Sequence, residues 1–273
     1  MLKEVAPLLL VGAGKMGGAM LDRWLARGID AHQVMIVDPF VEATRRDALR
    51  VSGATVVADP AELPRISPRI VVLAVKPQSM SAVLPAIAPL AGSGTAIVSV
   101  AAGVRLDKLE AAFPAGQPVV RAMPNTPAQI GMGMTVAVAN AGVSGEQRMA
   151  VDALLAAVGE VAWVDDEALI DGVTAVSGSG PAYVFLLAEC LAEAGRQAGL
   201  PADLAERLAR QTVAGAGALL ADSALPAATL RQNVTSPNGT TAAALAMLMA
   251  EDGLQPLLTR AVAAAKRRSV ELG

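Results

Sequence analysis

The sequence predicts an α/β fold in which an N-terminal, doubly wound parallel sheet is followed by an all-α C-terminal domain. Three observations support this. Short strand-like runs alternate with helical stretches in the first part of the chain, a glycine-rich turn follows the first run, and strand patterns stop after about Asp165. Such alternation is typical of a parallel sheet with helices on both faces. A length of 273 residues corresponds to about two domains, which we expect at 1–164 and 165–273.

The N-terminal domain is expected to contain short strands rich in β-branched residues. One of them, Ile70–Val75, is apolar at every position, which is typical of a strand buried on both faces. After the first strand, a helical pattern runs from Met16 to Arg27 and ends at Gly28. The expected strands are Leu8–Val11, Val34–Val37, Ile70–Val75, Ile97–Val100, Val119–Arg121 and Thr135–Ala139.

The C-terminal domain is expected to be a set of helices that one subunit cannot bury alone. Tyr183–Gln197 is predicted to form a helix, with Ser179 as its cap and Gly199 beyond its end. These helices are rich in Ala and Gly, and a helix that is apolar nearly all round must be buried. We therefore predict that they form a helical subunit interface. The further helices are expected at Ala202–Leu220, Thr240–Met249 and Leu254–Val270.

Composition argues against several classes of protein. The net charge of −3 and the pI near 5.3 argue against nucleic-acid binding, which needs a basic surface. A single cysteine, Cys190, excludes a disulfide framework and a multi-cysteine metal site, and no metal is predicted. Mean hydropathy is +0.48, but the uncharged stretches 77–104 and 122–145 are interrupted by Pro and Gly. With neither a membrane span of about 20 apolar residues nor a signal peptide evident at 1–5, we expect a cytoplasmic protein.

The glycine-rich turn predicts a dinucleotide site. Gly12, Gly14 and Gly17 form a G-x-G-x-x-G pattern directly after a strand and before a helix. These glycines allow a tight turn, close approach of a pyrophosphate and close packing of helix on strand, and the helix N-terminus offers free N–H groups. The alternative is a tight turn that binds nothing. The position between strand and helix favours a Rossmann-type domain that binds NADPH or NADH.

Asp38 stands at the end of the second strand, where such domains place an acidic residue against the adenosine ribose. A carboxylate there favours NADH, because it would repel a 2′-phosphate. Arg45 and Arg46 follow and could hold that phosphate, although both equally fit an exposed helix face. The choice between NADPH and NADH stays open.

The scarcity of proton carriers favours reduction of an imine over oxidation of an alcohol. Alcohol oxidation needs a base, usually His or Lys. The only histidine, His32, precedes the second strand and thus lies away from the strand ends that bind ligands. No lysine lies between Lys108 and Lys266. An imine nitrogen is itself basic, so its reduction requires mainly orientation.

Four blocks of sequence resemble the pyrroline-5-carboxylate reductase family in the same order, and the resemblance extends over essentially the whole chain. They are Ala74–Gln78, Arg121–Pro127, Ala175–Tyr183 and Val234–Thr241, and the ending Arg268–Leu272 also fits. The resemblance implies reduction of L-Δ1-pyrroline-5-carboxylate, a cyclic imino acid, to L-proline with NADPH or NADH, the last step of proline biosynthesis. It also implies an intertwined homodimer of the helical domain and, in many members, a pentamer of dimers.

The resemblance further implies roles for individual residues. The turn from Gly12 to Gly17 would take the pyrophosphate, Ala101 and Ala102 would lie along the nicotinamide, and Thr241 would bond the substrate's ring nitrogen. Thr241 would orient the imine rather than act as a strong acid. The remaining cofactor residues would be Lys15, Met16, Ala74, Val75, Lys76, Pro77 and Asn233, and the remaining substrate residues Glu167, Ser236, Gly239 and Thr240.

Two of these substrate assignments have plain alternatives. The segment Ser236–Thr241 reads as a carboxylate site, in which a loop runs into a helix N-terminus with its N–H groups free. The alternative is an ordinary Ser-Pro helix start capped by Thr240. Glu167 could simply be a solvated charge within Asp165–Glu167.

The chain also departs from the family pattern. Asn238 and Ala224 replace a common Gly and Glu, and Asp59–Glu62 replaces a segment that usually contains Asn.

Among rival functions, a β-hydroxyacid dehydrogenase would need a lysine in its second domain, which this sequence lacks there. A dinucleotide-binding protein without catalysis would be favoured by a degraded glycine turn or a missing Thr241, and both are intact.

Overall fold

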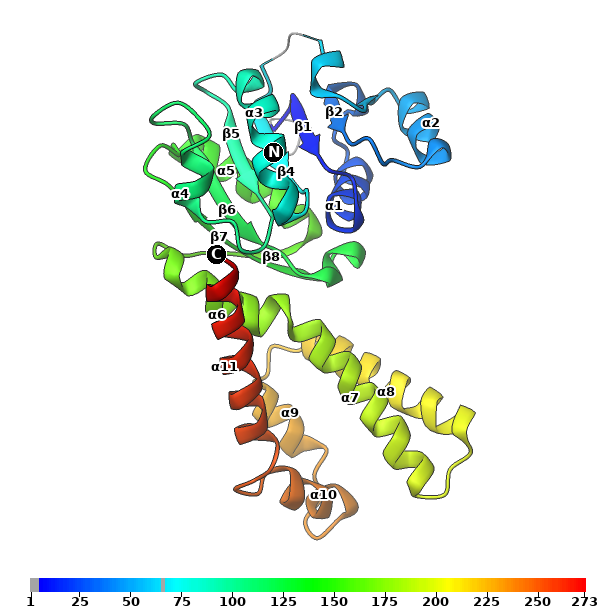
Figure 1. Ribbon diagram of the computed structural model, residues 1–273. Coiled ribbons are helices and arrows are strands. Elements are labelled where there is room, and N and C mark those ends of the chain that lie inside the picture. The colour runs from blue at the N-terminus through cyan, green and yellow to red at the C-terminus, as the bar shows by residue number, and fades with distance from the viewer. Residues whose placement is uncertain (1–4, 65–66) are drawn as a thin grey trace. The chain divides into compact units, whose positions relative to one another are not determined.

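The computed structural model describes residues 5–64 and 67–273, and the chain divides into two compact units. The first comprises the residues up to Gly178 together with Lys266–Gly273, and the second is Ser179–Ala265 (Figure 1). The boundary predicted between residues 164 and 165 concerns functional domains and stays a prediction. Residues 1–4, which entered the signal-peptide expectation, lie outside the described residues.

The described part of the first unit contains an eight-stranded sheet in the order β3-β2-β1-β4-β5-β6-β7-β8 (Figure 1). All neighbouring strands are parallel except β6 and β7, which are antiparallel. The order turns back between β1 and β4, and in open α/β sheets ligands bind outside the strand ends at such a point. The strands are β1 Leu8–Val11, β2 Val34–Val37, β3 Thr55–Val57, β4 Ile70–Leu73, β5 Ala96–Ser99, β6 Val119–Met123, β7 Gly133–Ala139 and β8 Gly159–Trp163.

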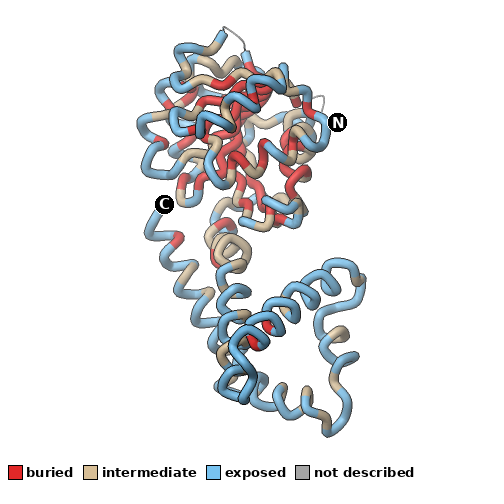
Figure 2. Tube along the Cα trace, turned by 90° about the vertical axis from the view of Figure 1, so that its right-hand side faces the viewer, coloured by how far each residue is buried: buried red, intermediate tan, exposed pale blue. Residues whose placement is uncertain are grey.

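Helices cover both faces of this sheet, which confirms the predicted fold class. Successive strand residues point to opposite faces, so Leu8 and Leu10 of β1 pack with Trp24 of α1, while Leu9 packs in a separate core with Ile87 of α3. Burial is concentrated in these two layers (Figure 2). The helices of this unit are α1 Lys15–Ala26, α2 Ala43–Val51, α3 Met80–Ile87, α4 Leu106–Glu110, α5 Gly145–Leu155 and α6 Ile170–Val173.

The second unit is helical, as predicted, but two local expectations were incomplete. The sequence did not predict α9, and Ser179 does not cap α7 with its side chain. The physical reason is that Ser179 directly follows a π-helical turn, Thr174–Gly178, and has helical backbone angles (φ −86°, ψ −21°), whereas a capping residue usually has an extended backbone. The helices are α7 Gly180–Gln197, α8 Ala202–Asp222, α9 Ala227–Asn233, α10 Thr240–Leu248 and α11 Leu254–Leu272, whose last turns belong to the first unit.

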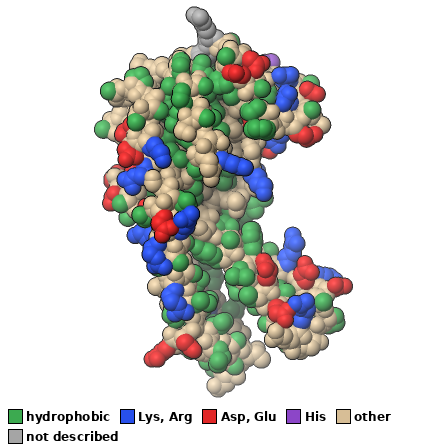
Figure 3. Space-filling view, in the orientation of Figure 1, with side chains coloured by type: hydrophobic (Ala, Val, Ile, Leu, Met, Phe, Trp, Pro, Cys, Tyr) green, Lys and Arg blue, Asp and Glu red, His purple; other side chains and the backbone are tan. Residues whose placement is uncertain are grey.

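Very little of the second unit is buried within a single chain. Its buried hydrophobic residues in the described structure are Ala205 and Ala209, at the packing of α7 against α8 (Figure 1). Large side chains such as Phe185 and Met247 are 62% and 75% exposed, and hydrophobic atoms are prominent on the surface of these helices (Figure 3). Apolar surface of this extent marks an interaction surface.

One helical segment, Leu169–Gln197, is long and apolar enough to cross a membrane by length and composition alone. The sequence prediction considered only the two uncharged stretches and did not single out this segment. It spans α6, the π-helical turn and α7, and a bend at Ser179 separates that turn from α7. The apolar window of this segment is 6% buried, and it includes exposed apolar side chains of α7 such as Phe185.

Candidate cofactor and substrate sites

Two glycines of the turn between β1 and α1 are required by the chain's own packing. Gly12 has φ +92°, and a Cβ atom there would lie 2.9 Å from the carbonyl of Ala74. A Cβ on Gly17 would collide with the carbonyl oxygen of Gly12 and lie 2.9 Å from Cβ of Ala74. The turn therefore lies directly against the end of β4, at the point where the strand order turns back.

Gly14 differs, because nothing in the chain requires it to be glycine. Its φ of −68° and ψ of −156° suit any residue, and no heavy atom lies within 4 Å of the position that a Cβ would take. It precedes α1, whose first N–H groups have no partner inside the helix. Gly14 therefore leaves open space beside free donors at a helix N-terminus, and these features fit the pyrophosphate of a dinucleotide.

The carboxylate of Asp38 is held against the glycine turn. Oδ2 accepts a hydrogen bond from the backbone N–H of Ala13 at 2.7 Å, and Oδ1 accepts one from Phe40 N–H at 2.8 Å. Asp38 thus stands beside the predicted pyrophosphate site with its charge fixed in place. The sequence predicted its position but not its bond to the turn.

The two arginines considered for a 2′-phosphate have protein partners. Arg45 donates to Asp22 Oδ1 of α1 at 2.8 Å and pairs with that carboxylate. Arg46 donates to the carbonyl of Val41 at 2.9 Å. Of the groups weighed for cofactor preference, Asp38 therefore lies directly on the turn, whereas Arg45 is held on the side of α1.

The predicted cofactor residues after β4 and β5 lie at the same edge of the sheet as the glycine turn. Ala74–Pro77 directly follow β4, and Ala74 N–H donates to the carbonyl of Val11 in β1 at 2.8 Å. Ala101 and Ala102 follow β5, with Ala101 buried and Ala102 exposed. Because carboxyl ends of parallel strands share one edge, the first unit brings all these residues to one side of the sheet.

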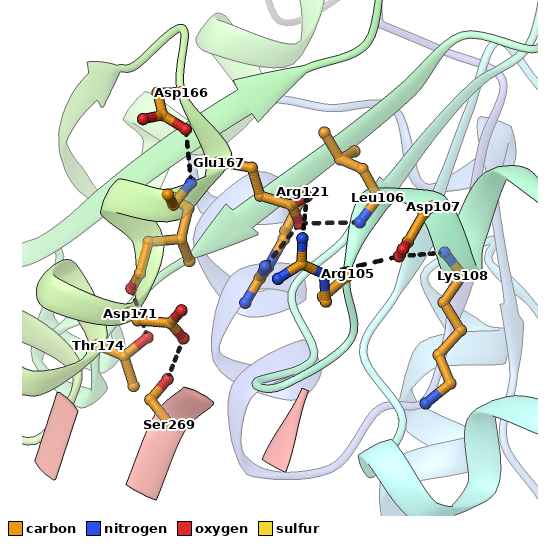
Figure 4. A network of polar contacts seen from close by, with 12 residues as sticks. Arg105, Leu106, Asp107, Lys108, Arg121, Asp166, Glu167, Asp171, Thr174 and Ser269 are labelled. Atoms are coloured by element: carbon orange, nitrogen blue, oxygen red, sulfur yellow. Dashed lines mark hydrogen bonds and ion pairs between the residues drawn. The ribbon is translucent and has the colours of Figure 1, made fainter. Parts of the chain in front are cut away.

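Glu167 is neither solvated nor free. It begins a 3-10 turn after β8, and its Oε1 lies 2.6 Å from Nη1 of Arg121, a 4% exposed residue of β6. The same oxygen accepts the N–H of Leu106 at 2.9 Å, and Oε2 lies 3.9 Å from Arg105 (Figure 4). Sequence reasoning missed Arg121 as a partner. A lone charge inside an apolar strand was the available signal, because such a charge needs a counter-ion.

The predicted substrate loop lies in the second unit and leads directly into α10. Gly239 is the residue before the helix and makes no side-chain cap, so the alternative in which Thr240 caps the helix is wrong. Gly239 N–H donates to the carbonyl of Ser236 at 3.1 Å, closing a turn. Thr241, in the first helical turn, is half-buried, while Thr240 and Ser236 are exposed. The first N–H groups of α10, which have no partner inside the helix, therefore directly follow a closed turn.

Asn238, which departs from the family pattern, adopts φ +57°. Glycine takes this left-handed conformation freely, and Asn is one of the few other residues that tolerate it. The departure thus preserves the backbone that a glycine would have there. Asn233, the remaining predicted cofactor residue, is the last residue of α9 and is exposed.

The second unit also has a shallow groove of about 460 Å³ between α9 and α10. It does not coincide with the predicted substrate loop, and its surface is mostly that of exposed helix faces. Its lining residues are Arg231, Gln232, Thr235, Ala242, Leu245, Ala246 and Met249.

Within the described ranges, no group of three or more His, Cys, Asp or Glu side chains is arranged to hold a metal ion. The carboxylates in Figure 4 bond guanidinium groups, a hydroxyl or backbone N–H groups. Their arrangement suits the fixing of loops and helix ends.

Comparison with known proteins adds two family matches and several full-length relatives. Residues 167–272 match the model described as pyrroline-5-carboxylate reductase dimerisation, and residues 8–103 match one described as NADP oxidoreductase, coenzyme F420-dependent. The chain is 43% identical to the pyrroline-5-carboxylate reductase of Pseudomonas aeruginosa, covering 97% of this chain and 96% of that protein. It is 42% identical to that of a Synechocystis species, covering 97% of each.

Solved structures agree over the whole chain. The pyrroline-5-carboxylate reductase of Coxiella burnetii superposes with a TM-score of 0.90 at 33% identity, covering 98% of this chain and 99% of the other. The pyrroline carboxylate reductase of Plasmodium falciparum, solved with NADP bound, gives a TM-score of 0.81 at 30% identity and covers 98% of both chains.

Proposed function

Because the chain belongs to the pyrroline-5-carboxylate reductase family and reduces pyrroline-5-carboxylate to proline with NAD(P)H, we propose specific roles for its residues in that reaction. The observation that supports the assignment best is the open space beside Gly14, next to the free N–H groups that begin α1 and on the glycine turn that bonds Asp38. The direct test is consumption of NADH or NADPH, followed by absorbance, on addition of pyrroline-5-carboxylate. No turnover with either cofactor in a folded sample would refute the proposal.

The first unit binds the cofactor. Gly14 leaves room for the pyrophosphate, while Gly12 and Gly17 let the turn pack against Ala74. Lys15 and Met16, the first helical residues, donate backbone N–H groups to the pyrophosphate. When bound, the nicotinamide supplies the hydride. Further contacts come from Asp38 at the ribose, from Ala101 and Ala102 at the nicotinamide side, and from Ala74, Val75, Lys76, Pro77 and Asn233.

The second unit binds the substrate. The carboxylate of the imino acid accepts hydrogen bonds from the N–H groups at the start of α10, with Ser236, Gly239 and Thr240 forming the turn around it. The hydroxyl of Thr241 hydrogen-bonds the ring nitrogen and fixes its orientation. The imine carbon gains the hydride, and the π electron pair of the C=N bond passes to the ring nitrogen, whose additional proton comes from solvent. The C=N double bond becomes a single bond, and the nicotinamide is left oxidised.

We propose that Asp38 makes NADH the better cofactor. Its carboxylate is fixed on the glycine turn, so a 2′-phosphate on the ribose would meet a negative charge there. Asp38→Asn removes the charge but keeps an oxygen that can accept the Ala13 N–H. We expect this change to raise kcat/KM for NADPH roughly tenfold relative to that for NADH, which corresponds to about 1.4 kcal/mol of repulsion relieved.

The measurement is the ratio of kcat/KM for the two cofactors in the wild type and in Asp38→Asn. Asp30→Asn is the control, since Asp30 is an exposed carboxylate that precedes β2, at the opposite end of the strand from Asp38, and its side chain accepts the His32 N–H, as an asparagine oxygen also can. A wild type that prefers NADPH, with a ratio unchanged in Asp38→Asn, would show that Asp38 does not select the cofactor.

The chain forms homo-oligomers through its dimerisation region, and we propose a homodimer made by α7–α11 that assembles further into a pentamer of dimers. The exposed apolar side chains of these helices support the dimer. The same interface would cover Leu169–Gln197, which lies almost wholly inside the matched region. We accordingly propose a cytoplasmic protein without membrane or nucleic-acid partners.

Phe185→Asp is expected to convert the oligomer to smaller species. Phe185 is 62% exposed in the single chain, and a charge buried without a partner in an interface costs several kcal/mol, or about a thousandfold in the dissociation constant. Light scattering after size-exclusion chromatography measures the mass. Phe40→Asp is the matched control, because Phe40 is 92% exposed on the first unit. A wild-type monomer, or an undisturbed Phe185→Asp oligomer, would contradict this interface.

A further inference from the structure

We propose that Glu167 is a positioning residue that acts through the loop 101–105, which it holds in place for hydride transfer, rather than by touching the substrate. The inference deepens the proposed function and rests on its placement of the nicotinamide beside Ala101 and Ala102. Three independent features of the first unit support it.

The first feature is the bond from Leu106 to Glu167. Leu106 begins α4, and the residue before it, Arg105, provides no side-chain cap. The carboxylate of Glu167, 61 residues further along the chain, accepts the Leu106 N–H at 2.9 Å. A side chain from a distant segment therefore fixes the point at which the loop after β5 becomes a helix (Figure 4).

The second feature is the ion pair that holds this carboxylate. Arg121 is 4% exposed, the Glu167 side chain is 17% exposed, and Nη1 lies 2.6 Å from Oε1. Arg105, at the end of the same loop, lies 3.9 Å from Oε2. Moving this partly buried carboxylate away from the two guanidinium groups would be energetically unfavourable, because a buried charge without its partner is strongly destabilising. A protonated imine nitrogen of the substrate would have to compete with Arg121 and Arg105 for the Glu167 carboxylate.

The third feature is the other side of the loop, which rests on the last turn of α11. Gly103 has φ +74°, and a Cβ there would lie 3.2 Å from the carbonyl oxygen of Leu272. Ser269, 6% exposed, donates its hydroxyl to Asp171 of α6 at 2.6 Å. The last turn of α11 is thus bonded to α6, which follows Glu167. The loop 101–105 therefore lies against the last turn of α11 at Gly103 and is followed by Leu106, which bonds Glu167.

Within this frame the loop has one outward-facing residue near its start. Ala101 and Val104 are buried, whereas Ala102 is exposed at the carboxyl edge of the sheet. A small displacement at Leu106 would shift the surface on which the nicotinamide rests, and a misplacement of about 1 Å can cost as much as a hundredfold in rate. The adenosine half of the cofactor, at the glycine turn and Asp38, would be unaffected.

The experiment compares Glu167→Ala and Glu167→Gln with Glu160→Gln as a control. Glu160, on β8, is exposed, so its change removes an equal charge without touching the loop. We expect Glu167→Ala to lower kcat about tenfold and to raise the deuterium isotope effect measured with 4-deuterated cofactor, because hydride transfer becomes slower. Glu167→Gln should recover part of kcat, since an amide oxygen can still accept the Leu106 N–H.

Two further measurements separate this role from others. Binding of ADP-ribose, which lacks the nicotinamide, should stay within about twofold of the wild-type value in both variants, as should the KM for pyrroline-5-carboxylate. A raised KM with unchanged kcat would instead establish the direct substrate contact inferred from sequence. If ADP-ribose binding, the melting temperature and kcat all fell together in Glu167→Ala, Glu167 would have a structural role only. An inactive wild type would refute the proposed function itself.

Discussion

Gly14→Ala is expected to give a protein that folds like the wild type but binds reduced cofactor far more weakly. The added methyl group meets no atom of the chain, and φ of −68° suits alanine. It would occupy the space that the pyrophosphate needs. Overpacking of this kind costs roughly 2–3 kcal/mol, or about 30- to 150-fold in the dissociation constant. Fluorescence titration with NADH or NADPH measures the loss, and thermal melting checks the fold.

Gly17→Ala is the matched comparison, because it adds the same methyl group three residues away. There the new Cβ would collide with the backbone of Gly12 and crowd Ala74, so the protein itself must shift and its melting temperature should fall. If the melting temperature of Gly14→Ala fell as far as that of Gly17→Ala, the glycine at position 14 would be required for folding and not for cofactor binding. If it bound cofactor normally, the pyrophosphate would lie elsewhere.

These two glycines illustrate what the sequence could and could not predict. The G-x-G-x-x-G spacing identified the turn, because its strand and helix are local and their limits are set by neighbouring residues. β1 and β2 were likewise predicted to the residue. The spacing did not reveal which glycine serves packing and which leaves space, since that depends on Ala74, brought there by the pairing of β1 with β4.

The missed elements have a similar cause. Thr55–Val57 is only three residues long, and Gly159–Trp163 contains Gly, Glu and Ala, which favour strands weakly. Both become strands through pairing with β2 and β7. The partnership of Arg121 with Glu167 spans 46 residues, and no local pattern reports a contact of that range. The fold class was predictable from periodicity, whereas the fixing of the cofactor loop was not.

Thr241→Ala is expected to reduce turnover while leaving cofactor binding intact. Thr241 lies in the first turn of α10, in the second unit, whereas the glycine turn and Asp38 lie in the first. Its hydroxyl is the group proposed to orient the ring nitrogen. Loss of one hydrogen bond to a charged or strongly polar group costs about 1.5–3 kcal/mol, or roughly 10- to 150-fold in kcat/KM. Steady-state kinetics and cofactor titration provide the two readouts.

Thr241→Ser and Thr259→Ala make the result specific. Serine keeps a hydroxyl at the start of α10 and should recover most of the rate. Thr259, in α11, uses its hydroxyl within its own helix, donating to the carbonyl of Gln255 at 2.9 Å, so its loss should leave kcat near the wild-type value. Because the backbone N–H groups of α10 remain in Thr241→Ala, the KM should change less than kcat. An unchanged kcat in Thr241→Ala would mean that the carboxylate contacts alone orient the imine, and that the hydroxyl serves only the helix start.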